Sequence, residues 1–294
     1  MKLITIKHAT LNKNSVIKDD YGDITISNIK NVYNSNGIVD LNTVTVNGIS
    51  TVGKGTTNVN GMILNSGSIV NRNSHIINIY DASVENNWNA IYNNDVGCII
   101  NIYGGSFNSI KQNTISNVGT ININGGTITS TVGNSITNTG TINIGSKDGN
   151  VSTEMPVITG KTYGVSNSDS GKVNFYDGIV SGESGAFYGT INEVEPGYKI
   201  VTNKTDTLTS ATLTLVGDDE KVAVLNGINF TSLQDAINSA SDTNESIITL
   251  YKDVTFESNI TVPANKNIKL YLNGYTLNKG SYDFTGEGKI TVID

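Results

Sequence analysis

Residues 99–144 read IINIYGGSFNSIKQNTISNVGTININGGTITSTVGNSITNTGTINI, and this stretch decides the fold. On both sides of it, the same phrase returns: an apolar residue, an asparagine, an apolar residue and a turn that contains Gly or Asp. The central asparagines are Asn78, Asn101, Asn122, Asn143 and Asn174, and the wide interval before Asn174 holds the polar stretch SKDGNVSTEMP, which predicts an inserted loop. A repeat of about 21 residues predicts a solenoid in which each repeat forms one coil.

A second series of asparagines follows the same rhythm at Asn93, Asn117, Asn138 and Asn167. An asparagine side chain can bond the backbone of its own turn and the equivalent asparagine of the next coil, and the residue tolerates left-handed dihedral angles. We therefore interpret this series as a structural ladder at a coil corner and not as a ligand site.

The INI phrase predicts which side chains fill the interior. Because side chains alternate between the two faces of a strand, the apolar residues point inward and the asparagine points outward. The expected interior column contains Ile77, Ile100, Ile121, Ile142 and Val173. Leucine-rich repeats need leucines that these units lack, and calcium-binding nonapeptide rolls need a shorter period. The prediction is an all-β, right-handed parallel β-helix with three strands in each coil of about 21 residues.

The extent of the repeat in the sequence predicts where this solenoid begins and ends. ITI at 24–26 and VTV at 44–46 keep nearly the same spacing, so the coils are expected to begin early, although the register between residues 50 and 75 stays open. The rhythm stops after GAFYGTINEVEPGYKIV. We assign residues 1–191 to the β-helix and 192–227 to a β-hairpin connector, in which Asn226-Gly227 suits a two-residue turn.

Residues 228–294 are predicted to form a capping helix and the start of a second, truncated β-helix. In FTSLQDAINSA, Thr231 or Ser232 can cap a helix whose apolar face carries a regular set of side chains. That set is Leu233, Ala236, Ile237 and Ala240. A helix at this position can cover the open end of the coils that follow.

The same period returns after this helix, at Ile248, Ile268 and Ile290. The runs INFTSLQDAINSA, IITLYKDVTF and IKLYLNGYTLN resemble the opening of pectate-lyase-like β-helix domains in large bacterial surface proteins, often described as adhesin-like. The resemblance covers the last part of the chain, from Ile228 onward. It implies attachment at a cell surface.

Composition excludes several classes of protein. Leucine is scarce and helical spacing is rare, which argues against a helical fold, while the alternating β-branched runs argue against disorder. The net charge is -7, with a pI near 4.9, and Arg72 is the single arginine, so no basic stripe is available for nucleic acid. Cys98 has no cysteine partner and is interpreted as a small core residue.

The expected location is extracellular or at the cell surface. No export signal is visible in MKLITIKHATLNKNSV, and no apolar run is long enough to insert into a membrane. Because the sequence ends on KITVID, within a strand pattern, we expect a section of a longer exported protein with adjacent domains as partners.

No residue is assigned a catalytic role, and no cofactor or metal is expected. The Asn-Thr-Asp, Gly-His-Gly and Arg-Ile-Lys motifs of polygalacturonase-type hydrolases are missing, and the Asp19-Asp20 and Asp218-Asp219 pairs have the context of solvated turns. Arg72 has no acidic neighbours close in sequence, as a lyase base beside calcium would need. His8 and His75 are too few for a metal triad.

Aromatic residues supply the candidate contact sites. Tyr80, Tyr103 and Tyr176 occupy one position of the repeat, which predicts a partly exposed column on which sugar rings could stack, although Asn124 and Gly145 interrupt it. A second cluster combines aromatic and acidic residues that could line a groove for sugar or calcium. It comprises Tyr80, Asp81, Glu85, Trp88, Tyr92 and Asp95. The inserted loop at Gly145–Pro156 is another candidate contact region.

These observations predict a non-enzymatic surface stalk or adhesin segment that presents contact sites to a host glycan or protein. The alternative is a polysaccharide-active lyase or glycoside hydrolase whose site is not recognisable. An ice-binding solenoid is disfavoured, because Ser83, Ser106, Thr127 and Ile179 do not form a continuous threonine row.

Overall fold

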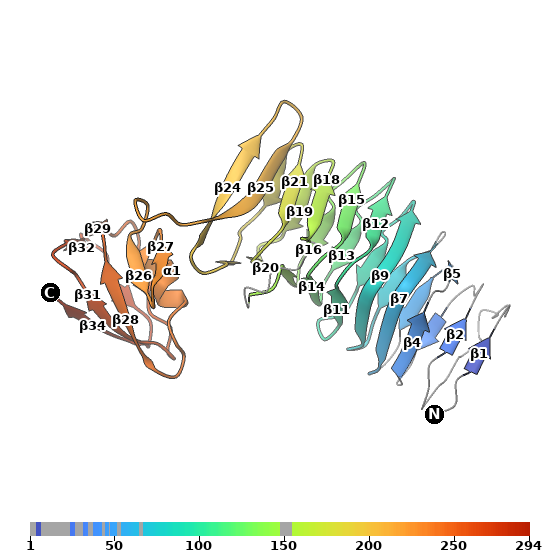
Figure 1. Cartoon of the computed structure of the whole chain (residues 1–294), viewed down its shortest axis with the longest axis horizontal. Helices are drawn as coiled ribbons and strands as arrows, with labels where there is room; N and C mark the ends of the chain where they lie inside the picture. Colours follow the sequence, from blue (N-terminus) through green and yellow to red (C-terminus); the bar gives the residue numbers. More distant parts are fainter. Residues whose placement is uncertain are drawn as a thin grey trace. The chain divides into compact units, whose positions relative to one another are not determined.

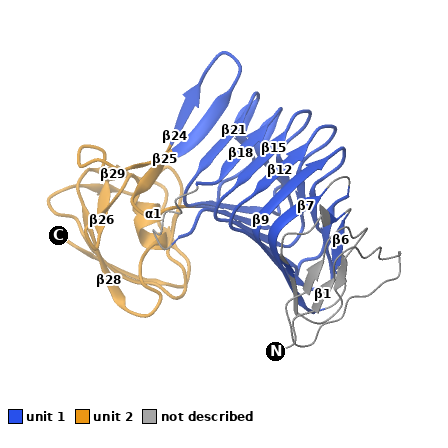
Figure 2. Cartoon of the chain, turned by 45° about the vertical axis from the view of Figure 1, so that its right-hand side comes forward, with its two compact units in different colours: residues 1–193, 201–212 blue, residues 194–200, 213–294 orange. Residues whose placement is uncertain are grey.

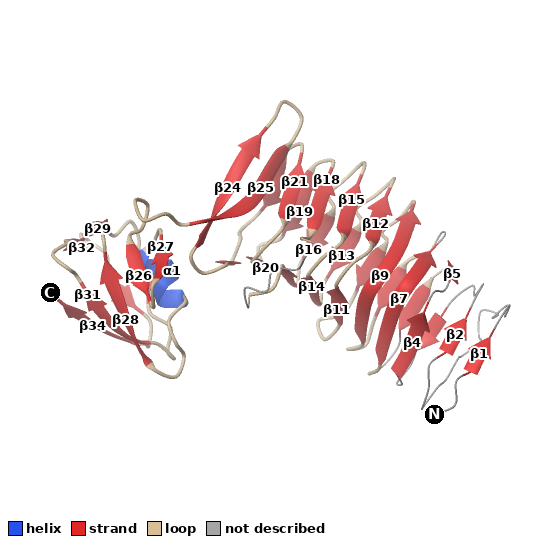
Figure 3. Cartoon of the chain, viewed as in Figure 1, coloured by secondary structure: helices blue, strands red, loops and turns tan. Residues whose placement is uncertain are grey.

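The computed structural model describes residues 4–6, 24–26, 32–34, 38–42, 45–46, 48–51, 54–64, 67–147 and 155–294. The chain is an all-β solenoid of about 11 turns, each of about 22 residues, and its described part contains one short helix (Figure 1 and Figure 3). Two compact units are distinguished by their internal contacts (Figure 2). Unit 1 comprises residues 1–193 and 201–212, and unit 2 comprises residues 194–200 and 213–294. The expected connector, 192–227, is thus divided between them.

Unit 1 is built from strands that pair in parallel with the equivalent strands of neighbouring coils. The first stack contains β1 (Ile4–Ile6), β2 (Ile24–Ile26), β4 (Ile38–Asn42), β7 (Thr56–Leu64), β9 (Ile76–Asn86), β11 (Ile99–Ile102), β14 (Thr120–Ile123), β17 (Thr141–Ile144), β20 (Lys172–Phe175) and β23 (Glu193–Val194). The second contains β5 (Thr45–Val46), β12 (Ser106–Ser109), β15 (Thr127–Ser130), β18 (Val157–Gly160) and β21 (Ile179–Gly182). Strands β7 and β9 are long enough to run through both stacks.

A third stack forms a separate sheet of eight strands. It contains β3 (Val32–Asn34), β6 (Ile49–Thr51), β8 (Ile69–Asn71), β10 (Ile91–Asn93), β13 (Ile115–Asn117), β16 (Ile136–Asn138), β19 (Tyr163–Asn167) and β22 (Gly185–Tyr188). Each of the three stacks contributes fully buried apolar side chains, for example Ile100, Phe107 and Ile115.

The predicted interior column is confirmed. Ile77, Ile100, Ile121, Ile142 and Val173 are each fully buried, and each pairs with the next through the strand register. Short β-branched side chains suit this interior because they pack well on a pleated surface and have few rotamers to lose. Cys98 is also fully buried, as expected for a core residue.

The second asparagine series forms the predicted ladder, which we call the buried ladder. Its members, each at most 3% exposed, are Asn71, Asn93, Asn117, Asn138 and Asn167. The side-chain amides of the first four members each donate to the carboxamide oxygen of the next member at 2.7–3.1 Å. Each also donates to backbone carbonyls at the corner, so the polar groups that the corner buries have partners.

The register near the N-terminus differs from the prediction. Ile24 of ITI pairs with Leu41, in the first stack. The VTV segment contains β5, which belongs to the second stack and pairs with Ile63–Leu64 of β7. ITI and VTV are therefore not equivalent positions of the coil. Connections between strands differ in length from coil to coil, which makes a constant spacing unreliable there. In the region left open, Ile49 pairs with Ile69 and Thr57 pairs with Ile77.

Antiparallel strands border the parallel sheets in both units. Val180 of β21 pairs antiparallel with Ala211 of β25 (Thr209–Leu215). Strand β25 forms a hairpin with β24 (Tyr198–Lys204), whose turn is closed by Thr205 and Leu208 (Figure 1). An antiparallel strand at this place pairs an edge that would otherwise be open to other chains.

In unit 2, the hairpin of β26 (Ala223–Leu225) and β27 (Ile228–Phe230) precedes the parallel coils. Asn226 and Gly227 have φ values of 53° and 80°, as a two-residue hairpin turn of the predicted kind requires. Strand β26 pairs antiparallel with β28, the first strand of the coils in unit 2. The parallel strands are β28 (Glu245–Leu250), β31 (Asn267–Tyr271) and β34 (Lys289–Ile293), with the pairs β29 (Val254–Thr255) and β32 (Leu277–Asn278), and β30 (Ile260–Thr261) and β33 (Phe284–Thr285).

Helix α1 (Leu233–Asn238) forms where it was predicted, with Ser232 as its N-cap. Leu233, Ala236, Ile237 and Ala240 are buried in the apolar cluster of unit 2, together with side chains of β28 and β31. The expected equivalence of isoleucines is partly wrong. Ile268 pairs with Ile290, but Ile248 pairs with Leu270. A slip by an even number of positions keeps every side chain on the same face, so the hydrophobic pattern alone does not exclude it.

Candidate functional site

The asparagines of the INI phrase form a second ladder, on the outer surface of the first stack. This outer ladder contains Asn58, Asn78, Asn101, Asn122, Asn143 and Asn174. Each amide donates to the carboxamide oxygen of the preceding member at 2.7–2.8 Å. A carboxamide has two N–H donors and two lone pairs, so the ladder bond to each neighbour leaves Asn101, Asn122 and Asn143 with a second donor and a second lone pair. These side chains are half-buried and reach solvent.

Beside the outer ladder lies the tyrosine column. The rings of Tyr80 and Tyr103 are stacked, with centroids 5.1 Å apart and planes 9° apart, and the two side chains are 51% and 42% exposed. Backbone hydrogen bonds place Asn124, Gly145 and Tyr176 at the same position in the following coils. One face of Tyr103 therefore contacts Tyr80, while the other is directed toward the short side chains that follow.

The interruption in the column produces a hollow of about 400 Å³, which we call the Asn groove. Its floor is formed by Asn101, Asn122 and Asn143, and its two ends by Tyr103 and Tyr176. Gly145 has a φ of +80°, and a Cβ there would lie 2.4 Å from the backbone nitrogen of Asp177. Local backbone geometry thus excludes a larger side chain at this position.

One wall of the Asn groove carries charge. Lys147 forms an ion pair with Glu193 and lies over the ring of Tyr176, with its Nζ 6.0 Å from the ring centroid. The hydroxyl of Tyr176 donates to the other carboxylate oxygen of Glu193 at 2.8 Å. Glu193 therefore holds both groups at the Tyr176 end of the groove.

The predicted aromatic and acidic cluster does not assemble as one surface. Tyr80 and Tyr103 stack at one end of the groove, but Tyr92 lies on β10 of the third stack, where it pairs with Ser116. Trp88 is 60% exposed in the segment between β9 and β10. Glu85 is exposed on β9, beside Asn108 of β12.

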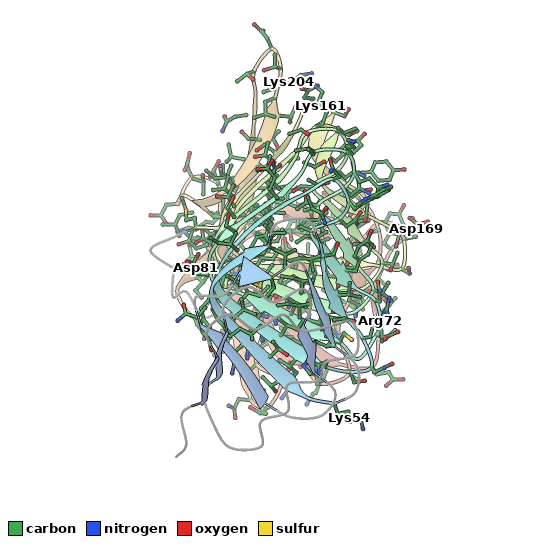
Figure 4. The ribbon with its side chains drawn as sticks, turned by 90° about the vertical axis from the view of Figure 1, so that its right-hand side faces the viewer. Lys54, Arg72, Asp81, Lys161, Asp169 and Lys204 are labelled. Carbon is green, nitrogen blue, oxygen red and sulfur yellow. The ribbon has the colours of Figure 1, made fainter. Side chains whose placement is uncertain are left out.

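Asp81 of the predicted cluster does not lie beside Arg72, the single arginine of the chain (Figure 4). Asp81 projects from the opposite side of the solenoid to Arg72 and Asp169 (Figure 4). Asp95 accepts a hydrogen bond from the backbone nitrogen of Asn73 at 2.7 Å. Within the described ranges, no three His, Cys, Asp or Glu side chains come together to hold a metal ion.

The remaining polar candidates have structural surroundings. His75 is fully buried; its Nδ1 accepts from the backbone nitrogen of Gly55, and its Nε2 lies 3.0 Å from the hydroxyl of Thr57. Asp218 pairs with Lys221, whose hydrogen bond lowers the pKa of the Asp218 carboxyl. His8 and Asp19-Asp20 lie outside the described residues, as does the middle of the loop at Gly145–Pro156.

Two features at the groove are not predicted by the sequence patterns. The outer-ladder asparagines mark the repeat in the sequence, but the repeat does not predict that they line a hollow. Glu193 follows the last clear repeat and lies far along the chain from Lys147, so no spacing connects the pair. The sequence does indicate the position of the groove, because the groove lies where Asn124 and Gly145 replace tyrosine in the column.

Among the described residues, no helix has the length and apolar character needed to cross a membrane. Comparisons with protein-family models, with curated proteins and with solved structures found no match.

Proposed function

We propose that unit 1 binds an oligosaccharide in the Asn groove and that the chain is a non-enzymatic segment of a large bacterial surface protein. In this proposal the solenoid is a right-handed, pectate-lyase-like β-helix with three strands in each coil. It serves as an adhesin-like stalk outside the cell, joined to adjacent domains, and presents the groove to a host glycan or glycoprotein.

The observation that carries this proposal is the combination of an open aromatic face with a row of carboxamides. Sugar rings have apolar faces that stack on aromatic rings, and Tyr103 offers such a face at one end of the groove. Sugar hydroxyls both donate and accept hydrogen bonds. The second N–H and the second lone pair of Asn101, Asn122 and Asn143 offer both functions in each coil.

The dimensions of the groove favour a short oligosaccharide over a single sugar. Tyr103 and Tyr176 are three coils apart, which at a strand spacing of ~4.8 Å corresponds to about 14 Å. The carboxamides repeat with the same spacing, so successive sugar units along an extended chain would each meet a new amide. The volume of about 400 Å³ is within the range of small-molecule sites.

The architecture supports the role as a stalk. The coils between Asn71 and Asn167 contact one another through parallel strands and through two asparagine ladders. A solenoid of this kind extends by adding coils while its outer surface keeps one pattern. A contact site built from equivalent positions of successive coils is then presented on a rigid surface.

Binding of the protein to a glycan array tests this function. Tyr103→Ala removes the stacking face and is expected to weaken binding roughly tenfold. Trp88→Ala is the matched control, since Trp88 is an exposed aromatic residue outside the groove, and it is expected to bind like the unchanged protein. Equal loss in both variants, or no loss in Tyr103→Ala, would contradict the site. Cleavage of any bound glycan would contradict the non-enzymatic role.

A further inference from the structure

We infer that the Asn groove selects neutral oligosaccharides and that Glu193 determines this selectivity. The inference rests on the proposed function and assigns the chemical class of its ligand. It concerns the Tyr176 end of the groove, where Lys147, Glu193 and Tyr176 are joined.

The first argument is the charge balance at this end. Within the described chain, Lys147 is the one charged side chain that lines the groove, and its ammonium group is paired with the Glu193 carboxylate. A ligand carboxylate that approached Lys147 would also approach Glu193. The attraction to one group is then offset by the repulsion from the other. Without Glu193, the same Lys147 would favour an acidic sugar.

The second argument is the chemistry of the floor. The carboxamides of Asn101, Asn122 and Asn143 each offer one donor and one acceptor beyond the ladder bonds. A hydroxyl group can satisfy both, because it donates and accepts. A carboxylate only accepts, so it would leave the amide oxygens without a donor and bring a negative charge beside them. Both arguments favour a ligand with hydroxyl groups and no charge.

Glu193 is held in place by more than the ion pair. The Tyr176 hydroxyl donates to one carboxylate oxygen at 2.8 Å, while Lys147 contacts the other. The Lys147 and Glu193 side chains are 54% and 39% exposed. An exposed ion pair contributes little to folding, so Glu193 can be changed without unfolding the coil.

A matched ion pair in the same unit supplies the control. Lys161 and Glu183 are paired on neighbouring coils, with side chains 52% and 45% exposed. Neither residue lines the Asn groove. Glu183→Gln therefore removes the same charge as Glu193→Gln from a similar environment away from the groove.

The experiment measures dissociation constants by calorimetry at low ionic strength. The probes are gluco-, manno- and galacto-oligosaccharides and the uronic-acid oligosaccharides of the same length. The unchanged protein is expected to prefer neutral probes. Glu193→Gln is expected to shift the ratio of acidic to neutral affinity roughly fivefold toward the acidic probes, and Glu183→Gln is expected to leave this ratio unchanged.

The outcomes separate this inference from the proposed function. If the unchanged protein binds no probe of either class, the proposed function is wrong. If it binds acidic probes as well as neutral ones, or if Glu193→Gln does not differ from Glu183→Gln, glycan binding stands but the assignment of Glu193 is overturned. A neutral preference that Glu193→Gln relaxes supports both.

Discussion

Units 1 and 2 are both solenoids of parallel strands, but polar groups stabilise them in different ways. Unit 1 has two ladders of neutral carboxamides that run from coil to coil. Unit 2 has one small apolar cluster covered by α1, and most of the ion pairs found in the described residues. Its ion pairs are Lys199–Glu220, Lys221–Asp218, Lys266–Asp242, Lys269–Glu245 and Lys279–Asp283.

The difference shows what a long repeat permits. An asparagine donates and accepts at once, so identical residues can bond in an unlimited row without bringing like charges together. The same row would be unfavourable for aspartate or lysine, because like charges in successive coils repel. A short solenoid cannot gain as much from such a row. In unit 2 a helix and charge pairs are found instead.

The buried ladder of unit 1 is expected to give the largest effect. Asn117 donates to Gly119 and Thr141 carbonyls and to Asn138, and accepts from Asn93. Asn117→Leu would leave several buried polar groups without partners, at about 3–6 kcal/mol of unfolding free energy. Denaturation followed by the fluorescence of Trp88, the single tryptophan, measures this loss. Asn87→Leu, at an exposed position, is the control, and equal stability of the two variants would contradict the ladder's role.

The helix cover of unit 2 comes next. Leu233 is 2% exposed in the apolar cluster, and Leu233→Ala is expected to cost about 2–5 kcal/mol by removing buried methyl groups and leaving a cavity. Hydrogen exchange should then accelerate in β28 and β31 but not in β13 or β16. Leu215→Ala, at a residue of unit 2 that is 65% exposed, should leave exchange unchanged. Slow exchange in β28 after Leu233→Ala would show that α1 does not stabilise the coils.

The N-cap of α1 is expected to contribute less. The Ser232 hydroxyl oxygen accepts from the backbone nitrogen of Asp235 at 3.1 Å. Ser232→Ala should reduce the stability of unit 2 by about 1 kcal/mol, whereas Ser232→Thr keeps the acceptor and should recover most of it. Thermal unfolding of both variants is the measurement. Identical midpoints would mean that the cap contributes nothing.

The smallest difference is expected on acidification. Hydrogen bonds from Lys221 and Lys199 lower the pKa of Asp218 and Glu220, respectively. Such carboxylates add stability above their unfolded pKa, and the contribution disappears as the pH falls below the ordinary values of 3.8 and 4.5 and through the folded pKa. Backbone hydrogen-exchange rates, corrected for their intrinsic pH dependence, should therefore rise more on acidification in unit 2 than in the strands of unit 1.

A control variant distinguishes these pairs from general acid effects. In Asp218→Asn/Glu220→Gln the two carboxyls are gone, so the response of unit 2 to acid should become smaller. An unchanged response would assign the effect to other carboxyls. One of these is Asp283, whose pKa is also lowered, mainly by a hydrogen bond from Lys279.

Much of the fold could be predicted because the repeat encodes its own register. Equivalent residues such as Ile100, Ile121 and Ile142 are the same type in successive coils, so their alignment is visible in sequence. The predicted register was wrong where equivalent positions of neighbouring coils carry different residue types. Ile248 pairs with Leu270, and a slip by an even number of positions preserves the apolar face, so only the actual connection lengths decide between the registers.

The candidate site was harder to predict, because its shape depends on two positions where short residues replace large ones. The sequence predicts the tyrosine column, in which the short residues Asn124 and Gly145 are interruptions. Stacking turns these interruptions into a hollow with an aromatic end. Glu193 lies on β23, after the last strand that carries the INI phrase, so no repeated motif indicates its role.

Filling the gap in the tyrosine column tests the central claim most directly. Asn124→Tyr would continue the stack of Tyr80 and Tyr103 and occupy the groove, whereas Ser116→Tyr adds the same ring beside Tyr92 on the third stack. Calorimetric titration with the oligosaccharide that the unchanged protein binds best compares the two. We predict that Asn124→Tyr weakens binding at least tenfold, equivalent to about 1.4 kcal/mol, while Ser116→Tyr does not. Unchanged affinity in a folded Asn124→Tyr variant would contradict the Asn groove as the binding site.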